Sequence, residues 1–335
     1  MSQTQNITIQ DIAAKANVSI STVSRVLNGT VPVAEAKKNA VMAAVSELDY
    51  QPNVFAQGLV HGHSMTIGVL TQNVSGPVYD AMLRGVLQGL QGSDYSPIFA
   101  DGRWQAEREQ RAIQLLMSRR IDGLIVLGGS SPETFLQQIG QEVPLIVVAR
   151  RLSTLPGQSL MIDDFRGAYQ ATQYLLQMGH RSIAHITGIP THEDAQARYQ
   201  GYQQALIDAG ITPDPNLVIE GTFQEQSGGM AVEMLLSRNR TFSAIFAAND
   251  QMAYGARLAL FRRGLRVPDD VSLVGFDDQH PSAYTIPPLT TVRIPASEMG
   301  EAAAEAILKQ LAGQSHKLPT LSADLVVRES VARFR

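Results

Sequence analysis

The chain has 335 residues, 44% of them hydrophobic and 17% charged, which is the composition of an ordinary globular protein of two or three domains. The absence of cysteine excludes a disulfide framework and a thiolate metal site, and the net charge of −4 is far from the strongly basic balance of a chain that binds polyanions over its whole surface. The N-terminal sequence lacks the basic start and apolar run of a secretory signal, and no stretch approaches the roughly 20 apolar residues that span a bilayer. We therefore expect a cytoplasmic protein without membrane contact.

Three short helices, with a tight turn between the first two, are predicted for residues 8–53. Thr8 can cap the first helix, and Asn17-Val18 interrupts its apolar pattern. Ser19 offers a new cap for a second helix, which should end near Asn28-Gly29 because this pair is common where helices stop. A helical hairpin that only covers another domain would show the same pattern.

The second of these helices should carry a small, polar face opposite the valines that pack on the first helix. Such a face suits the DNA major groove, where bulky side chains would block the approach to base edges. The residues on this face are Ile20, Ser21, Thr22, Ser24 and Arg25.

The segment resembles the DNA-binding headpiece of the lactose/galactose repressor family of bacterial transcription regulators, and the motifs TVSRVLN and LDYQPN carry the resemblance. It implies that Ile20 and Ser21 read operator bases, while other positions make more general base and phosphate contacts. The chain departs from the family at the start of the third helix, where Ala34 replaces a serine cap and Lys37-Lys38 replaces a Thr-Arg pair. The lost cap should cost about 1 kcal/mol. The residues expected to contact DNA are Thr8, Ile20, Ser21, Thr22, Ser24, Arg25, Asn28, Lys37, Asn53 and Leu59.

Residues 52–64 stand where this family has a hinge helix that orders on operator DNA and inserts a leucine into the minor groove. Leu59 occupies the position of that leucine. Gly58 should weaken the helix, because glycine in a helix interior costs about 1 kcal/mol. A flexible linker without DNA contact is the alternative.

From Met65 onward, short apolar strands alternate with helices, which indicates parallel sheets covered on both faces. The expected fold is multi-domain, with an all-α helix-turn-helix headpiece and a two-lobed α/β core with parallel sheets. By the resemblance, the core is like a periplasmic binding protein, and the chain crosses back to the first lobe near Thr290–Ile294 before the strand-like LVVRES returns to the second. The predicted boundaries are 7–51 for the headpiece, 52–64 for the hinge, 65–335 for the core, 65–164 plus 294–320 for the N-lobe, and 165–293 plus 321–335 for the C-lobe. The predicted helices of the core cover about 79–90, 105–119, 132–139, 195–209 and 295–311, with two more ending near 236 and 263.

Polar residues at the carboxyl ends of the predicted strands are the candidates for a small-molecule site, because ligands of open α/β sheets bind there. Arg198, Asn249 and Asp277 together offer a guanidinium fork, a carboxamide and a carboxylate, which suit a polyhydroxylated ligand such as a sugar. Phe223 could face the apolar side of a pyranose. These four positions match the effector-contacting positions of the family, although Asn249 and Asp277 could instead cap helices or satisfy loop amides.

Four first-lobe residues stand at comparable positions, and each either touches the ligand or lies beside it. They are Tyr79, Asp101, Arg103 and Arg150. Trp104 could shield the mouth of the cleft, although packing is the expected role. Asp250 and Asp278 are expected to be supporting or capping groups.

No signal for catalysis, a cofactor or a metal is recognisable. No Gly-x-Gly-x-x-Gly follows a strand, no phosphate loop with lysine appears, and no serine sits in a nucleophile elbow. His180, His185 and His192 are too loosely spaced for a helical metal pair and are expected on the surface or in core hydrogen bonds. We therefore expect neither a catalytic residue nor a cofactor nor a metal ligand.

The resemblance implies a repressor of carbohydrate-utilisation genes that a sugar or glycoside releases from a near-palindromic, double-stranded operator. A homodimer is expected, because the chain has no leucine-heptad tail of the kind that makes tetramers. Three alternatives stay open: a corepressor-type regulator with a non-sugar effector such as a purine, a sugar-binding protein without a role on DNA, and an enzyme with an appended DNA-binding module.

Overall fold

The computed structural model describes residues 7–28, 32–50, 63–238 and 241–334. The chain forms two compact units, Met1–Ser64 and Met65–Arg335. Within the described part of the chain, no helix combines the length and the apolar character needed to cross a membrane.

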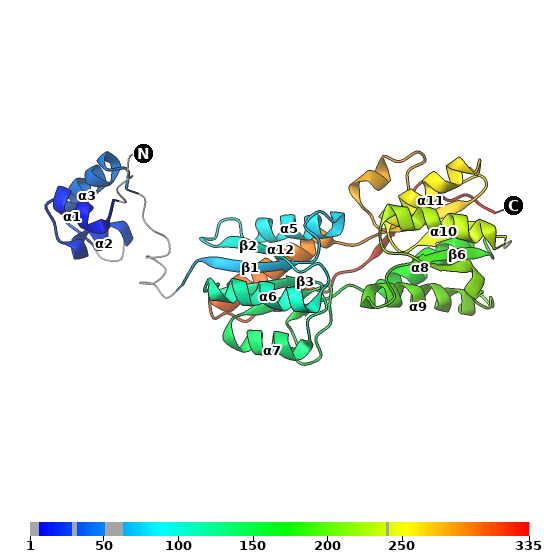
Figure 1. The fold of residues 1–335 in the computed structure, drawn as a ribbon, viewed down its shortest axis with the longest axis horizontal. Coiled ribbons are helices and arrows are strands. Elements are labelled where there is room, and N and C mark those ends of the chain that lie inside the picture. The colour runs from blue at the N-terminus through cyan, green and yellow to red at the C-terminus, as the bar shows by residue number, and fades with distance from the viewer. Residues whose placement is uncertain (1–6, 29–31, 51–62, 239–240, 335) are drawn as a thin grey trace. The chain divides into compact units, whose positions relative to one another are not determined.

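The N-terminal unit consists of the helices α1 (Ile9–Lys15), α2 (Ile20–Asn28) and α3 (Glu35–Glu47) (Figure 1). The carboxylate of Asp11 accepts hydrogen bonds from the hydroxyl and the backbone N–H of Thr8, at 2.7 and 2.8 Å, and these bonds lower the pKa of Asp11. Ser19 Oγ accepts from the backbone N–H of Thr22 at 3.2 Å, so Ser19 caps α2 as predicted.

Five buried side chains form the core of this unit and hold the three helices together. This unit buries little apolar surface in total, so each buried apolar side chain contributes a large share of its stability. Burying one valine or isoleucine contributes roughly 1.5–3 kcal/mol. The buried residues are Ile12, Ala13, Val23, Val41 and Ala44.

The first sheet of the larger unit is parallel throughout and has the strand order β2-β1-β3-β4-β5. The inner strands β1, β3 and β4 are apolar and buried because helices cover both faces. Helices α5 and α12 pack on one face and α6 and α7 on the other (Figure 1). The strands are β1 (Thr66–Thr71), β2 (Ser96–Asp101), β3 (Gly123–Leu127), β4 (Leu145–Val148) and β5 (Ser159–Leu160), and the helices are α5 (Pro77–Gly89), α6 (Ala106–Ser118), α7 (Glu133–Glu142) and α12 (Ala296–Leu311).

The second sheet has the order β11-β10-β9-β8-β6-β7, and only β11 runs antiparallel to its neighbour. Helices α8 and α9 pack together on one face, and α10 and α11 pack together on the other (Figure 1). The strands are β6 (Ile183–Thr187), β7 (Val218–Glu220), β8 (Ala244–Ala247), β9 (Ser272–Asp277), β10 (Thr290–Arg293) and β11 (Asp324–Val326). The helices are α8 (Asp164–Gln177), α9 (Glu193–Asp208), α10 (Glu225–Ser237) and α11 (Asp250–Arg262), with short 3₁₀ turns at Pro215–Leu217 and His280–Ala283.

We call the two sheets with their helices the first and the second lobe. The chain changes lobe after β10, since α12 packs against α5 in the first lobe, and it returns to the second lobe with β11. The fold class expected from the sequence is therefore the one observed.

Helix α8 was not predicted from the sequence. Its buried positions are largely small or polar, with Gly167, Ala168, Ala171 and Thr172 among them and Leu175 as the one large aliphatic side chain. A stripe of small residues gives a weak hydrophobic periodicity, although it lets α8 approach α9 closely.

Gly300 on α12 is one of the points where this helix closely approaches α5. A β-carbon at this position would lie 2.0 Å from the carbonyl oxygen of Met82. We expect Gly300→Ala to push the two helices apart and to lower the free energy of unfolding of the core by about 1–3 kcal/mol, measured by urea denaturation.

Gly140→Ala on α7 is the matched control, because the nearest atom to its new β-carbon is Leu145 Cδ2 at 3.5 Å. This variant should be neutral or should gain up to about 1 kcal/mol from its higher helix propensity. Equal losses in the two variants would contradict the proposed helix contact.

Candidate functional site

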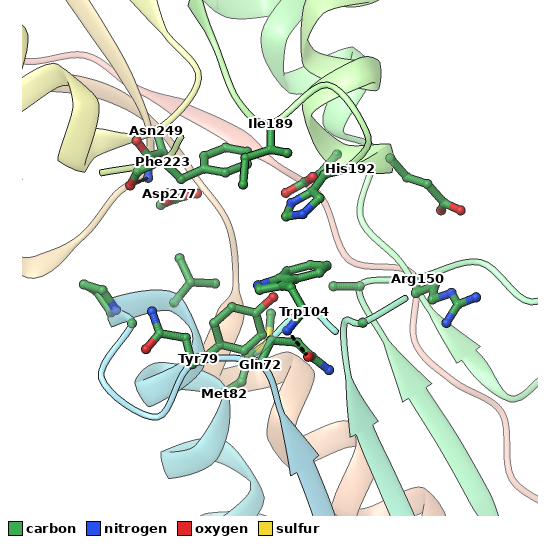
Figure 2. A pocket seen from close by; sticks show the side chains of 18 of the residues that line it. Gln72, Tyr79, Met82, Trp104, Arg150, Ile189, His192, Phe223, Asn249 and Asp277 are labelled. Atoms are coloured by element: carbon green, nitrogen blue, oxygen red, sulfur yellow. Dashed lines mark hydrogen bonds between the residues drawn. The ribbon is translucent and has the colours of Figure 1, made fainter. Parts of the chain in front are cut away.

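A cavity of about 720 Å³ lies between the two lobes, at the carboxyl ends of the parallel strands (Figure 2). All eight residues predicted from the sequence to face a small molecule line this one cavity, although they come from segments far apart in the chain. They are Tyr79, Asp101, Arg103, Arg150, Arg198, Phe223, Asn249 and Asp277.

Arg198 of α9 is the most heavily bonded of these residues. Its Nε donates to Asp164 Oδ1 at 2.8 Å and its Nη1 donates to the carbonyl oxygen of Ala248 at 2.6 Å. Its Nη1 also lies 3.5 Å from Asp277 Oδ1, and its guanidinium carbon lies 3.8 Å from the ring centre of Phe276. The guanidinium is thus fixed in position while part of its edge faces the cavity.

Burial governs the charges in this network. It raises the pKa of Asp164 to about 6 and the pKa of Asp277 well above the ordinary aspartate value, although the guanidinium of Arg198 acts in the opposite direction on both. Burial also disfavours the charge of Arg198, but the surrounding carboxylates outweigh it and raise the pKa of the guanidinium.

Asn249 caps α11, as the alternative interpretation of the sequence held, and it also lines the cavity. Its Oδ1 accepts from the backbone N–H of Met252 at 2.9 Å, and its Nδ2 donates to the carbonyl oxygen of Phe223 at 3.0 Å. Phe223 has a positive φ of 63°, so this bond helps to hold its ring at the cavity wall. A carboxamide has four hydrogen-bonding positions, so bonds remain available for a ligand.

The first-lobe residues differ in how firmly they are held. Tyr79 reaches the cavity from α5, and burial raises the pKa of its phenol well above the usual value. Arg103 is 67% exposed in its side chain and lies 3.7 Å from Asp101, which makes the pair loose and well solvated. Nη1 of Arg150 is buried without a hydrogen-bond partner among the described residues.

Four further residues line the cavity that were not proposed from the sequence as ligand contacts. Gln72 directly follows β1, the same signal that identified Asn249 after β8. His192 and Trp104 are half-buried, and their rings stack at the cavity with centroids 4.0 Å apart. Asp164 gave no signal, since it begins the unpredicted helix α8.

Two buried carboxylates that do not line the cavity bind the side chains around the end of β9. Asp250 accepts from the hydroxyls of Ser282 and Thr291, both at 2.6 Å, and burial raises its pKa to about 7. Asp278 accepts from Arg293 at 2.7 Å and from Arg328 at 2.6 Å. His180 and His185 form hydrogen bonds within the core, as expected; among the described residues, no group of three or more potential ligands could hold a metal ion.

The predicted DNA-contacting face of α2 is turned to the solvent. Ile20 is 47% exposed, Ser21 and Arg25 are exposed, and Val23 on the opposite side is fully buried. The hydroxyls of Ser21 and Thr22 each lie 2.9 Å from Ser19 Oγ, and Thr22 and Lys37 border a surface hollow. Ser24 is half-buried, and Thr8 bonds to Asp11. The side chain of Asn28, together with Asn53, Leu59 and most of the predicted hinge, lies outside the described residues.

Arg198→Ala should lower the free energy of unfolding at pH 7 by roughly 3–5 kcal/mol, because it leaves two buried carboxylates without their cation. Without the guanidinium, the pKa values of Asp164 and Asp277 rise further in the folded protein. The folded state then binds more protons than the unfolded one, so the deficit relative to wild type should shrink as the pH falls from 7 towards 5.

Denaturant titrations at both pH values measure this effect, with Arg103→Ala as the control for removing an exposed arginine. The control should stay within about 0.5 kcal/mol of wild type. A deficit of Arg198→Ala that did not change with pH would show that the carboxylates are not the cause.

Comparison with known proteins places this geometry in a family. Residues 8–53 match the bacterial regulatory proteins of the lacI family, and residues 172–331 match the periplasmic binding protein-like domain. The ribose operon repressor of Haemophilus influenzae is 34% identical, with 97% of this chain and 98% of the relative covered. The regulator GalR of Escherichia coli is 36% identical (97% and 96% covered), and the repressor PurR of Edwardsiella ictaluri is 33% identical (97% of each).

Solved structures agree with the sequence relatives. The lac repressor dimer bound to operator and the anti-inducer ONPF superposes with a TM-score of 0.88 at 29% identity, with 98% of this chain and 100% of that chain covered. The complex of the transcriptional regulator CelR with cellobiose gives a TM-score of 0.72 at 33% identity, with 97% and 99% covered. The resemblance identified in the sequence is thereby confirmed. The chain belongs to the lacI family of bacterial regulatory proteins, and it is a DNA-binding transcriptional repressor, not an enzyme.

Proposed function

We propose that this repressor controls carbohydrate-utilisation genes and that a sugar or glycoside releases it from its operator. The observation that carries the proposal is the convergence of Arg198, Asn249 and Asp277 on one cavity with the ring of Phe223 beside them. A sugar presents several neighbouring hydroxyls and one apolar face, and this set offers partners for both.

The balance of donors and acceptors favours a sugar over a purine. Carboxylates line the cavity from both lobes, among them Asp101, Asp164, Asp194 and Asp277. An ionised carboxylate only accepts hydrogen bonds, and a carboxyl group that burial has protonated still keeps acceptor positions, so the set suits a ligand with many donors. A sugar carries a hydroxyl on most of its carbons, whereas a purine base carries few N–H groups.

A purine effector stays the second candidate, because aromatic rings also line the cavity. Tyr79, Trp104, His192 and Phe223 could stack on a planar base. The relatives divide in the same way: their names include a ribose operon repressor and PurR, and one solved relative holds cellobiose.

On the DNA side, we propose that α2 enters the major groove of a near-palindromic, double-stranded operator and that the protein acts as a homodimer. The exposed, small and polar face of α2 supports the first part. The lac repressor relative was solved as a dimer on its operator. Large apolar side chains exposed on the neighbouring helices α10 and α11 and in the loop after β9 suit a self-association surface; they are Met230, Leu258, Phe261, Tyr284 and Ile286.

The binding of the operator would then weaken the binding of the effector, and the reverse, by the same coupling free energy, typically 1–3 kcal/mol. A ligand that bridges the two lobes can set the angle between them. If the operator requires one angle and the ligand favours another, each weakens the binding of the other.

Arg25→Ala should weaken operator binding by about 1–3 kcal/mol, because Arg25 is exposed on the face of α2 that we propose to contact DNA. Fluorescence anisotropy with a labelled operator over a salt series measures both the affinity and its salt dependence. Lys309→Ala, which removes an exposed cation from α12, is the control and should bind like wild type. Equal affinities of the two variants would contradict the placement of α2 on DNA.

Asp277→Asn should retain operator binding and lose the effector response, because the amide removes one acceptor for ligand hydroxyls while keeping the side-chain volume. Thermal shifts are measured with D-ribose, D-galactose, cellobiose, hypoxanthine and guanine. A sugar at 100 times its Kd should stabilise the wild type by about 2.7 kcal/mol, and the shift should be much smaller in Asp277→Asn.

Asp269→Asn, an exposed aspartate paired with Arg266, is the matched control and should respond like wild type. Stabilisation by the purines alone would overturn the sugar assignment. An unchanged sugar response of Asp277→Asn would show that the ligand binds elsewhere.

A further inference from the structure

The rings of Trp104 and His192 meet across the cavity from opposite lobes. Trp104 lies between β2 and α6 of the first lobe, and His192 immediately precedes α9 of the second. Their ring centroids are 4.0 Å apart and their planes differ by 23°, which is a stacked pair. Figure 2 shows the indole and the imidazole pointing toward one another across the gap between the lobes.

This pair, which we call the inter-lobe stack, lies at the solvent edge of the cavity. The neighbours Arg103, Thr191 and Glu193 are exposed, while Trp104 and His192 themselves are half-buried. The rings of Tyr79 and Phe223 continue the aromatic wall on either side, at 6.1 Å from Trp104 and 6.0 Å from His192. The wall therefore extends without interruption from one lobe to the other.

The indole is held in place by its own loop. Arg103 and Trp104 have positive φ angles of 52° and 56°, a conformation that residues other than glycine adopt rarely and keep only when their surroundings impose it. Gln72 Oε1 accepts a hydrogen bond from the backbone N–H of Trp104 at 2.9 Å and supplies part of that constraint.

His192 has an unused hydrogen-bonding atom. Its Nδ1 is buried and has no partner among the described residues, and Nε2 of Gln72 is in the same situation on the opposite lobe. Burial lowers the pKa of His192, which favours the neutral ring, and a neutral imidazole can accept a hydrogen bond as well as donate one. Buried polar atoms without partners are uncommon in proteins and often mark a place that a ligand or water fills.

We propose that the inter-lobe stack closes the effector cavity and that Nδ1 of His192 hydrogen-bonds a hydroxyl of the bound sugar. The second part rests on the sugar response proposed above. Because the two rings belong to different lobes, a ligand that bonds to His192 also fixes the distance between His192 and Trp104. The stack thus makes the lobe spacing depend on which ligand is bound, so these two residues determine specificity.

Trp104 is the only tryptophan of the chain, so its fluorescence reports on the stack directly. Iodide quenching of the ligand-free protein tests the first part of the proposal. His192→Ala uncovers one face of the indole and should raise the quenching constant, whereas His192→Phe keeps a ring on that face and should quench like wild type. Gln200→Ala, at an exposed position on the same helix, is the control. Equal quenching of wild type and His192→Ala would overturn the stack.

Titrations with D-galactose and with cellobiose, followed by Trp104 fluorescence and by thermal shift, test the second part. A sugar that stabilises the wild type should change the fluorescence. It should also bind up to about tenfold more weakly to both His192→Phe and His192→Ala, because both lack Nδ1. A sugar that stabilises all three proteins with equal affinity would overturn the role of His192 while leaving the proposed sugar response intact. If hypoxanthine alone stabilised the wild type, the sugar response and the hydroxyl contact would both be wrong, and the quenching result would decide the stack by itself.

Discussion

The buried guanidinium of Arg198 is the interaction on which the cavity depends. It joins the start of α8 through Asp164, the end of β8 through the carbonyl oxygen of Ala248, and the end of β9 through Asp277. Burying one cation with two carboxylates is favourable only when the geometry satisfies all of them. The strict geometry that this requires also presents a fixed polar surface to the cavity, so under the proposed function the stability of the second lobe and the recognition of the ligand would depend on the same atoms.

Much of this site could be predicted from sequence, because parallel sheets place the polar residues after each apolar strand at a common edge. Asn249 follows β8 and Asp277 ends β9, so both were found by counting from buried strands. Arg198 and Phe223 lie after strands at less regular distances and were chosen for their chemistry, and the lacI resemblance supported all four positions. The contact between Trp104 and His192 was not predicted, because it joins loops of different lobes and no local pattern encodes such a contact.

The helices that were predicted carry a local apolar pattern, and the helix that was missed, α8, does not. Helices such as α6 carry large aliphatic residues at helical spacing, including Ile113 and Leu116, and their limits agree with the prediction to within a few residues. Helix α8 buries glycine, alanine and threonine instead. Its stability comes from close packing against α9, which is a property of the pair of helices and not of either sequence alone.

The position of the cavity next to the lobe connections gives a ligand a direct mechanical effect on the core. Asp277 lines the cavity, and the next residue, Asp278, binds Arg293 and Arg328. Arg293 ends the strand from which the chain leaves the second lobe, and Arg328 follows the strand with which it returns. Both aspartates have positive φ angles, so their backbone has few alternative conformations. A ligand that shifted Asp277 would therefore act on the same stiff turn that holds the lobe connections.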